Sequence, residues 1–203
     1  MNGLRLPRRL LPLGLTALAA CSVLPQPKYV QQTQWPLIVH RPQSLPRAAR
    51  GKVLVVRDVQ AAPGVDQRGL QWFEPNGSVH VDFYNQWAVT PSQAATSNLQ
   101  QWLTASGLFS AVVGGGSGLI PNLILDTQLT QFIADPRNLT AHCAILVTLI
   151  NADRTPSTVL LQQTIAGEAR MPVDTPEGVA DGLRAALADA LGKSEAAIAQ
   201  YAR

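Results

Sequence analysis

Three long apolar runs decide the fold of this chain: "NLILDTQLTQFIAD" (122–135), "LTAHCAILVTLIN" (139–151) and "STVLLQQTIAGEA" (157–169). Each run mixes leucine and β-branched residues with polar ones, as strands with one core-facing and one more polar side do. Turn and breaker residues separate the runs, at Asp135–Asn138 and at Asp153–Pro156. The pattern predicts an antiparallel meander of three consecutive strands.

Two segments around these runs show helical periodicity. The segment "TPSQAATSNLQQWLTASG" (90–107) offers Thr90 as N-cap, a proline at the first helical position, and Gln93 to complete a capping box. The chain ends in a second, alanine-rich helix that opens at Asp174 or Thr175, followed by a proline. Both segments carry apolar residues three and four positions apart, which predicts one buried side on each helix.

Shorter strands are predicted in the N-terminal half, at "WPLIVH" (35–40), "KVLVVRDV" (52–59), "LQWFE" (70–74), "VHVDFYN" (79–85) and "LFSAVV" (108–113). Val79, Val81 and Phe83 alternate with the residues between them, which is typical of a half-buried strand. Asn76-Gly77 is a strong hairpin signal. The predicted fold class is α+β, with a mostly antiparallel sheet packed against two main helices in one domain.

The start of the chain indicates a targeting segment. Arg5, Arg8 and Arg9 precede an apolar run from Leu10 to Ala20, which is too short to span a bilayer but has the length of a signal-peptide core. The sequence Leu18-Ala19-Ala20-Cys21 resembles the bacterial lipobox, so we expect cleavage before Cys21 and lipidation of its thiol. The alternative is an ordinary secretory signal followed by an incidental cysteine.

These features divide the chain into three parts. Residues 1–20 form the predicted lipoprotein signal peptide. Residues 21–34 form a lipidated N-terminus and a flexible tether, because "SVLPQPKYVQQTQ" (22–34) has two prolines, four glutamines and no periodicity. Fully extended, this tether would reach roughly 40 Å. Residues 35–203 form one domain.

The charge balance argues against a nucleic-acid partner. The chain has 16 Lys and Arg against 13 Asp and Glu. Removal of the signal peptide takes away Arg5, Arg8 and Arg9, so the mature chain has 13 of each sign and lacks the basic excess of nucleic-acid-binding domains. The bases between Lys28 and Arg57 precede the first acidic residue and are either a patch for anionic head groups or a solvated segment.

No constellation of catalytic or metal-binding residues is evident. His40, His80 and His142 match no metal-ligand spacing, and no serine lies in a Gly-x-Ser-x-Gly motif. The "GGGSG" run (114–118) lacks the Lys-Ser/Thr of a phosphate loop. We expect Cys143 to be a buried, inert thiol, and Asp82 and Asp126 to face solvent. The sequence therefore predicts no catalytic residue, no metal and no cofactor.

The aromatic residues allow two interpretations. Trp72, Phe73, Trp87 and Trp102 account for most of the aromatic side-chain volume, and the first interpretation is core packing. In the second, Trp72, Phe73 and Trp87 line an apolar groove or a subunit interface, where aromatic residues are enriched.

The order of these features resembles the ABC-type transport auxiliary lipoprotein family, which includes paraquat-inducible protein C-like lipoproteins. The resemblance rests on the lipobox, the tether, the strand "KVLVVRDV", the segment "FYNQWA" before a helix, "GLFSAVV" and the closing alanine-rich helix. It covers the chain from Cys21 to about Tyr201. The segment "LQWFEPNGSVHV" departs from it by lacking the Tyr-Arg that members often show near this strand.

The resemblance implies a non-enzymatic auxiliary component of a phospholipid transport system that maintains envelope integrity. Its partners would be an MCE-domain protein and an inner-membrane permease complex, with phospholipid contact and ring-shaped homo-oligomers. Since Ser22 rather than aspartate follows the cysteine, we expect lipid anchoring to the outer membrane on its periplasmic face. Two alternatives stay open: a structural or assembly adaptor of the outer membrane or cell wall, and a lipid-anchored hydrolase.

Overall fold

The computed structural model describes residues 30–202 of the chain. The structured domain comprises the residues from Gln32 onward. The predicted signal peptide, Cys21 and most of the predicted tether lie outside the described residues. The first strand of the domain, β1 (Thr33–Trp35), begins within the last two residues of the segment that the sequence predicts as tether.

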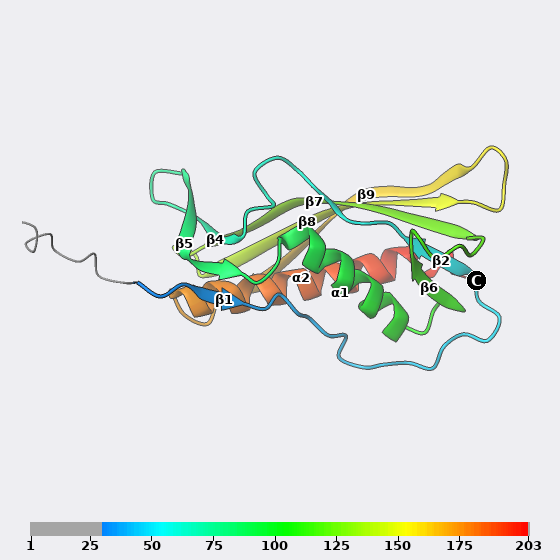
Figure 1. Ribbon diagram of the computed structural model, residues 1–203, viewed down its shortest axis with the longest axis horizontal. Coiled ribbons are helices and arrows are strands. Elements are labelled where there is room, and N and C mark those ends of the chain that lie inside the picture. Colours follow the sequence, from blue (N-terminus) through cyan, green and yellow to red (C-terminus); the bar gives the residue numbers. More distant parts are fainter. Residues whose placement is uncertain (1–29, 203) are drawn as a thin grey trace, which may run out of the picture. The chain divides into compact units, whose positions relative to one another are not determined.

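The meander predicted from the three apolar runs is present (Figure 1). Strand β7 (Leu123–Asp135) pairs antiparallel with β8 (Thr140–Asn151) over its whole length, and β8 pairs in the same way with β9 (Thr158–Arg170). These three strands are twice as long as most others in the sheet and contribute most of its paired residues. Residues 136–139 and 152–157 form the two connections.

The second edge of β7 is shared by three short strands, each parallel to it. Strand β2 (Val53–Val56) pairs with the start of β7, β3 (Gln60–Ala61) with the middle and β4 (Gly69–Phe73) with a single position near the end. Strand β6 (Ala111–Gly114) lies beyond β2. Strand β5 (Val79–Trp87) lies beyond β4, and β1 lies beyond β5, which completes a nine-stranded sheet. The sheet is mostly antiparallel by paired residues, as predicted.

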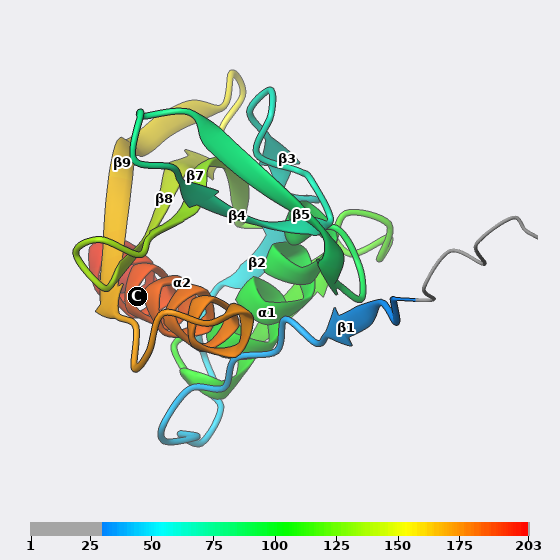
Figure 2. The same ribbon diagram turned by 90° about the vertical axis from the view of Figure 1, so that its left-hand side faces the viewer.

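Both helices cover the same face of this sheet (Figure 2). Helix α2 (Pro176–Ala199) packs against β8 and β9, and α1 (Pro91–Ala105) packs beside it near β6 and β2. The side chains of β7 and β8 that point toward the helices form the core together with the helix stripes: Leu123, Leu125, Leu129, Cys143, Ile145, Val147, Leu149. The α+β prediction is confirmed, and the other side of the sheet is called here the open face.

The segment between β1 and β2 crosses the helices as an irregular strap, where the sequence predicted a strand at 35–40. Leu37 and Val39 are buried in the core. Their backbone groups bond to one side chain of α1, since Asn98 accepts from the Val39 N–H at 2.9 Å and donates to the Leu37 carbonyl at 2.9 Å. An ion pair between Arg41 and Glu195 of α2 at 2.9 Å holds the next turn of the strap. An amide side chain therefore takes the place of a strand partner.

The two helices begin in different ways. Thr175 is the N-cap of α2, and its side chain accepts a hydrogen bond from the Gly178 N–H at 3.2 Å. The capping box predicted for α1 does not form, because the Thr90 side chain makes no capping bond. The carboxylate of Asp66, in a loop distant in sequence, instead accepts from the Ser92 N–H at 2.8 Å and from its hydroxyl at 2.9 Å. A negative charge is favourable at a helix N-terminus.

Strand β5 presents its apolar side chains outward. Val79, Val81 and Phe83 are exposed, Phe83 to 66%, whereas Asp82 is only 9% exposed. The expectation that Asp82 faces solvent is therefore wrong. Its carboxylate is satisfied by three donors, the backbone N–H groups of Tyr84 and Asn85 and the amide side chain of Asn85. Such bonds offset the desolvation of a carboxylate.

Close packing of α2 on β9 gives a stability prediction. A Cβ added at Gly167 of β9 would lie 2.2 Å from the Ala186 carbonyl oxygen and 2.5 Å from the Ala190 nitrogen of α2. Gly167→Ala should lower the free energy of unfolding by about 1–3 kcal/mol, because the helix must move away. Gly116→Ala is the control, since nothing lies within 4 Å of its added Cβ. Urea unfolding measures the free energy of unfolding of both variants. An equal loss in the two variants would contradict close packing at Gly167.

Candidate functional site: the open face of the sheet

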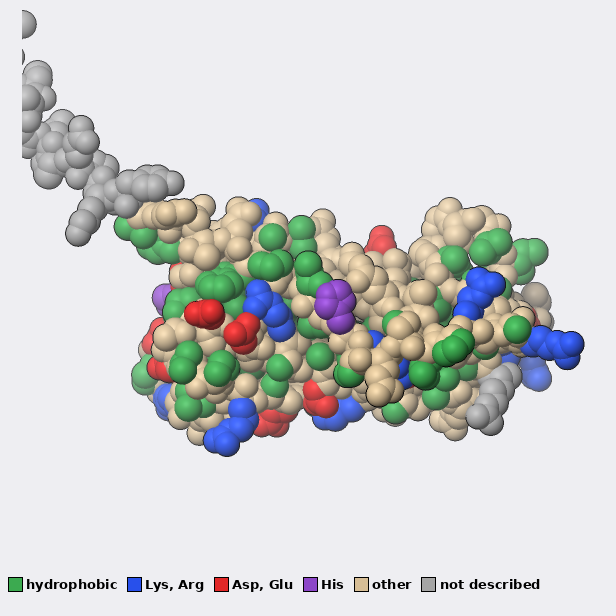
Figure 3. Space-filling view, turned by 90° about the horizontal axis from the view of Figure 1, so that it is seen from below, with side chains coloured by type: hydrophobic (Ala, Val, Ile, Leu, Met, Phe, Trp, Pro, Cys, Tyr) green, Lys and Arg blue, Asp and Glu red, His purple; other side chains and the backbone are tan. Residues whose placement is uncertain are grey.

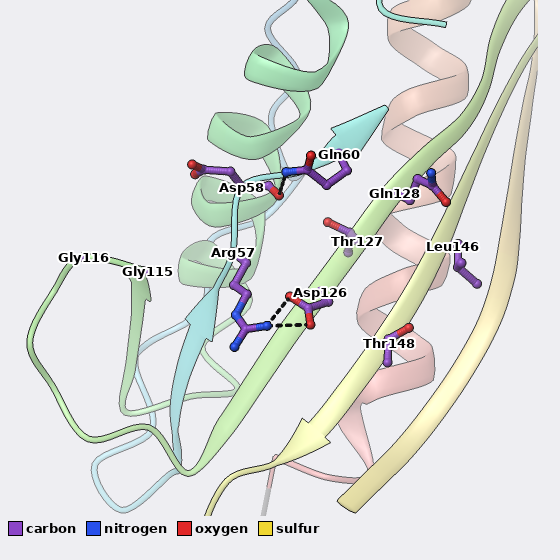
Figure 4. A pocket seen from close by; sticks show the side chains of 10 residues that line it. All are labelled: Arg57, Asp58, Gln60, Gly115, Gly116, Asp126, Thr127, Gln128, Leu146 and Thr148. Carbon is purple, nitrogen blue, oxygen red and sulfur yellow. Dashed lines mark hydrogen bonds and ion pairs between the residues drawn. The ribbon is translucent and has the colours of Figure 1, made fainter. Parts of the chain in front are cut away.

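The open face carries a polar cleft where β7 emerges beside β2 and β3 (Figure 4). The cleft has a volume of about 690 Å³. Its lining comes from the residues that follow β2, the start of β3, the glycine loop after β6, outward positions of β7 and β8, and the buried Thr127 of β7: Arg57, Asp58, Gln60, Gly115, Gly116, Asp126, Thr127, Gln128, Leu146, Thr148. Strands distant in sequence thus place three charged groups around one hollow.

An ion pair forms one wall of this cleft. One terminal nitrogen of the Arg57 guanidinium donates to both carboxylate oxygens of Asp126, at 2.9 and 3.2 Å. Both side chains remain partly exposed, so the pair contributes little to stability and can exchange partners. Asp58 is exposed at the rim of the cleft, and its carboxylate points away from the Arg57–Asp126 pair (Figure 4). Thr127 is buried, and its hydroxyl has no hydrogen-bond partner among the described residues.

A second hollow on the open face is apolar. This groove, of about 460 Å³, lies between the β4–β5 hairpin, the loop before β4 and the second half of β7. Phe73, Val79, Val81 and Ile133 supply its apolar lining. One border is fixed by the Gln71 side chain, whose amide donates to the Gly64 carbonyl at 2.9 Å. A preformed apolar groove of this volume is within the range of ligand sites.

Strand β5 bends beside the groove and projects two aromatic rings. The bonds of the Asp82 carboxylate to the next backbone N–H groups hold the bend. Gly69 of β4 permits the close approach, because a Cβ there would lie 2.4 Å from the Asp82 carbonyl oxygen. Phe83 and Tyr84 follow, with their rings edge to face at 5.2 Å. Both rings are exposed, which is typical of a contact surface.

The three aromatic residues of the sequence hypothesis have different surroundings. Phe73 lines the apolar groove. Trp72 is half-buried on the other side of β4 and stacks on His80 with ring centroids 4.2 Å apart. Trp87 is 1% exposed and packs 5.8 Å from the Phe132 ring in the core. The interpretation of Trp87 as a groove or interface residue is therefore corrected to core packing, because its strand turns inward after the bend.

Sequence reasoning missed the main features of the open face. Arg57 and Asp126 are 69 residues apart, and only the parallel pairing of β2 with β7 brings them together. Phe83 belongs to an alternating pattern that does not reveal which side of the strand faces the core. One signal in the sequence could have indicated the bend. Asp82 is followed three residues later by Asn85, and Asp and Asn side chains favour hydrogen bonds to nearby backbone groups.

The described part of the chain contains a buried thiol and no metal-binding cluster. Residues 30–202 contain no group of three His, Cys, Asp or Glu side chains that could hold a metal. His142 and Cys143 point to opposite faces of β8, and burial raises the pKa of the Cys143 thiol from 9.0 to about 12. The "GGGSG" run forms a loop after β6. Neither helix of the described residues has the length and hydropathy to cross a bilayer.

The face seen from below the view of Figure 1 has a mixed surface. Acidic and basic side chains are interspersed there with small groups of hydrophobic ones (Figure 3). The fold and the open face together define a single-domain α+β protein with a polar cleft and an apolar groove on one side of its sheet.

The chain belongs to the ABC-type transport auxiliary lipoprotein component family, whose sequence model matches residues 37–193. The family resemblance drawn from the sequence is thereby confirmed. Members are lipoproteins and auxiliary components of transporters, which associates the chain with the cell envelope. No protein with a curated description matches it.

Two solved structures share the fold. One is a Xanthomonas campestris protein of the DUF330 family, 16% identical, with a TM-score of 0.68; the alignment covers 83% of this chain and 95% of that one. The other is an uncharacterized protein, 15% identical, with a TM-score of 0.64 and coverage of 85% and 99%. At these identities the likeness concerns the fold.

The buried thiol gives a prediction with a pH dependence. In the Cys21→Ser chain, Cys143 should react with iodoacetamide only after unfolding. Because the folded pKa is raised, the unfolded thiol ionises first, so stability falls above the ordinary pKa of 9.0. The free energy of unfolding should fall by about 1.4 kcal/mol between about pH 8 and pH 10. Adding Cys143→Ala to this chain should remove the contribution of the thiol to the fall in the free energy of unfolding. Rapid labelling of the folded chain would contradict the burial of Cys143.

Proposed function

We propose that this protein is an outer-membrane lipoprotein, anchored through Cys21 on the periplasmic face, that serves an ABC/MCE-type phospholipid transport system. Family membership supports the auxiliary transport role. The lipobox at residues 18–21 supports the anchor, and Ser22 after the cysteine supports outer-membrane sorting. In this role the protein helps to maintain the envelope barrier.

The observation that carries the proposal is the open face with its exposed aromatic pair. An auxiliary component without chemistry of its own must act by holding partners or lipid. Phe83 and Tyr84 project from a bend fixed by a buried carboxylate, and a rigid exposed aromatic pair is suited to a protein–protein contact. We assign the contact with the MCE-domain protein and its inner-membrane permease complex to this pair.

The proposal also covers assembly and mechanism. A homo-oligomer, implied by the family resemblance, would present several copies of the aromatic pair to the transport complex. No residue is assigned a catalytic role. The tether gives the anchored domain reach, and the chain enters the domain at β1, which pairs with β5 at residues 85–87. The anchor chain therefore enters beside the strand that carries Phe83.

The anchor is tested by Cys21→Ser. The variant should lose palmitate labelling entirely, because the thiol that accepts the lipid is absent, and it should leave the membrane fraction. Three acyl chains give stable membrane attachment, whereas one is marginal. The unaltered chain is the control, and density-gradient fractionation should place it with outer-membrane markers. Normal labelling of the variant would end the lipoprotein assignment, and co-migration of the unaltered chain with inner-membrane markers would end the outer-membrane placement.

The contact is tested by Phe83→Asp. Loss of the aromatic anchor and introduction of a charge should reduce co-purification of the MCE-domain protein and permease by about tenfold or more after mild detergent extraction. Val159→Asp is the matched control, because Val159 is an exposed valine, to 60%, on a different strand. Both variants should keep the urea unfolding curve of the unaltered chain. Retention of the partners by Phe83→Asp, or their loss in both variants, would contradict the assignment.

A further inference from the structure

The polar cleft and the apolar groove are neighbours along one strand. The outward positions of β7 run from Asp126 and Gln128 in the cleft to Thr130 and Ile133 in the groove. The seven residue steps from Asp126 to Ile133 span at most about 23 Å. One bilayer leaflet, half of the hydrocarbon core plus a headgroup layer, is roughly 20 Å thick. The two hollows together thus match one extended phospholipid in length.

The charges of the cleft favour one type of headgroup. Its charged lining is one guanidinium, Arg57, and two carboxylates, Asp58 and Asp126. Only one nitrogen of Arg57 is bonded by the described residues, which leaves donors for a phosphate. The lining has a net negative charge, so an anion alone is disfavoured. A headgroup with a phosphate and an ammonium complements it, with the phosphate at Arg57 and the ammonium at Asp126.

The groove is suited to an acyl chain because its lining is mostly apolar. Phe73, Val81 and Ile133 present their side chains into it. An occupant of the groove receives apolar contacts from these side chains, and a hydrocarbon chain needs no hydrogen-bond partner there.

We infer that the open face binds one zwitterionic phospholipid, with its headgroup in the cleft at Arg57 and Asp126 and one acyl chain in the groove over Val81. The inference rests on the proposed function and names its lipid class. It assigns the lipid to the cleft and groove and the protein partner to Phe83, which lines neither hollow. The two contacts can therefore be disrupted separately.

The test uses the full chain carrying Cys21→Ser, so that its own lipid cannot fill the groove. Phosphatidylethanolamine and phosphatidylglycerol with identical acyl chains are offered in equal amounts, and native mass spectrometry counts the bound lipid. We expect one lipid per chain. Phosphatidylethanolamine should exceed phosphatidylglycerol about two- to fivefold, the effect of one exposed charge pair.

Two variants separate the two ends of the site. Val81→Asp should weaken the binding of both lipids by about tenfold or more, because a charge then faces the acyl chain. The Val81→Leu chain should bind both lipids as the unaltered chain does. Asp126→Asn should bring the ratio of the two lipids close to one. Val159→Asp and Asp174→Asn are the controls, exposed positions outside both hollows, and should change nothing.

The outcomes distinguish this inference from the proposed function. Equal binding of the two lipids, or binding that Val81→Asp leaves intact while the variant folds normally, would overturn the phospholipid site. If no lipid binds and Phe83→Asp still loses the transport partners, the inference is wrong and the proposed function stands. If lipid binds as expected and Phe83→Asp keeps its partners, the protein contact is wrong and the lipid site stands.

Discussion

The pairing of β7 on both of its edges is the constraint on which the rest of the structure depends. One edge is bonded over its whole length to β8. The other is shared by β2, β3 and β4, which reach it from the N-terminal half of the chain. Since each short strand has few hydrogen bonds of its own, its position is fixed by this common neighbour. Loss of β7 would separate the two halves of the sheet.

The one-sided arrangement of the helices follows from the same sheet. Helix α2 lies close enough to β9 that Gly167 is needed at the contact, and α1 fills the space beside it over β2 and β6. The strap bonded to Asn98 covers part of α1. With both helices and the strap engaged there, the described chain has no further element to cover the other side. A polar cleft and an apolar groove therefore remain on one continuous face.

The open face combines two kinds of contact. The charged residues of its cleft are an exchangeable ion pair and an exposed acid, and the apolar residues of its groove are held by strand geometry. Such a face can hold an amphiphile or a protein surface. The buried Asp82 carboxylate acts indirectly, because it fixes the bend that exposes Phe83.

The sequence by itself determined the meander, both helices, the α+β class and the family, since these follow from local periodicity, breakers and the order of motifs. It also placed Cys143 correctly, because a thiol in an apolar strand is usually buried. Only the tertiary structure decided which side of β5 faces the core, since an alternating pattern has two sides and the choice depends on a buried, fully bonded Asp82. The Arg57–Asp126 pair and the Asp66 cap of α1 likewise join residues distant in sequence. Their partners are set by strand order, which local pattern does not encode.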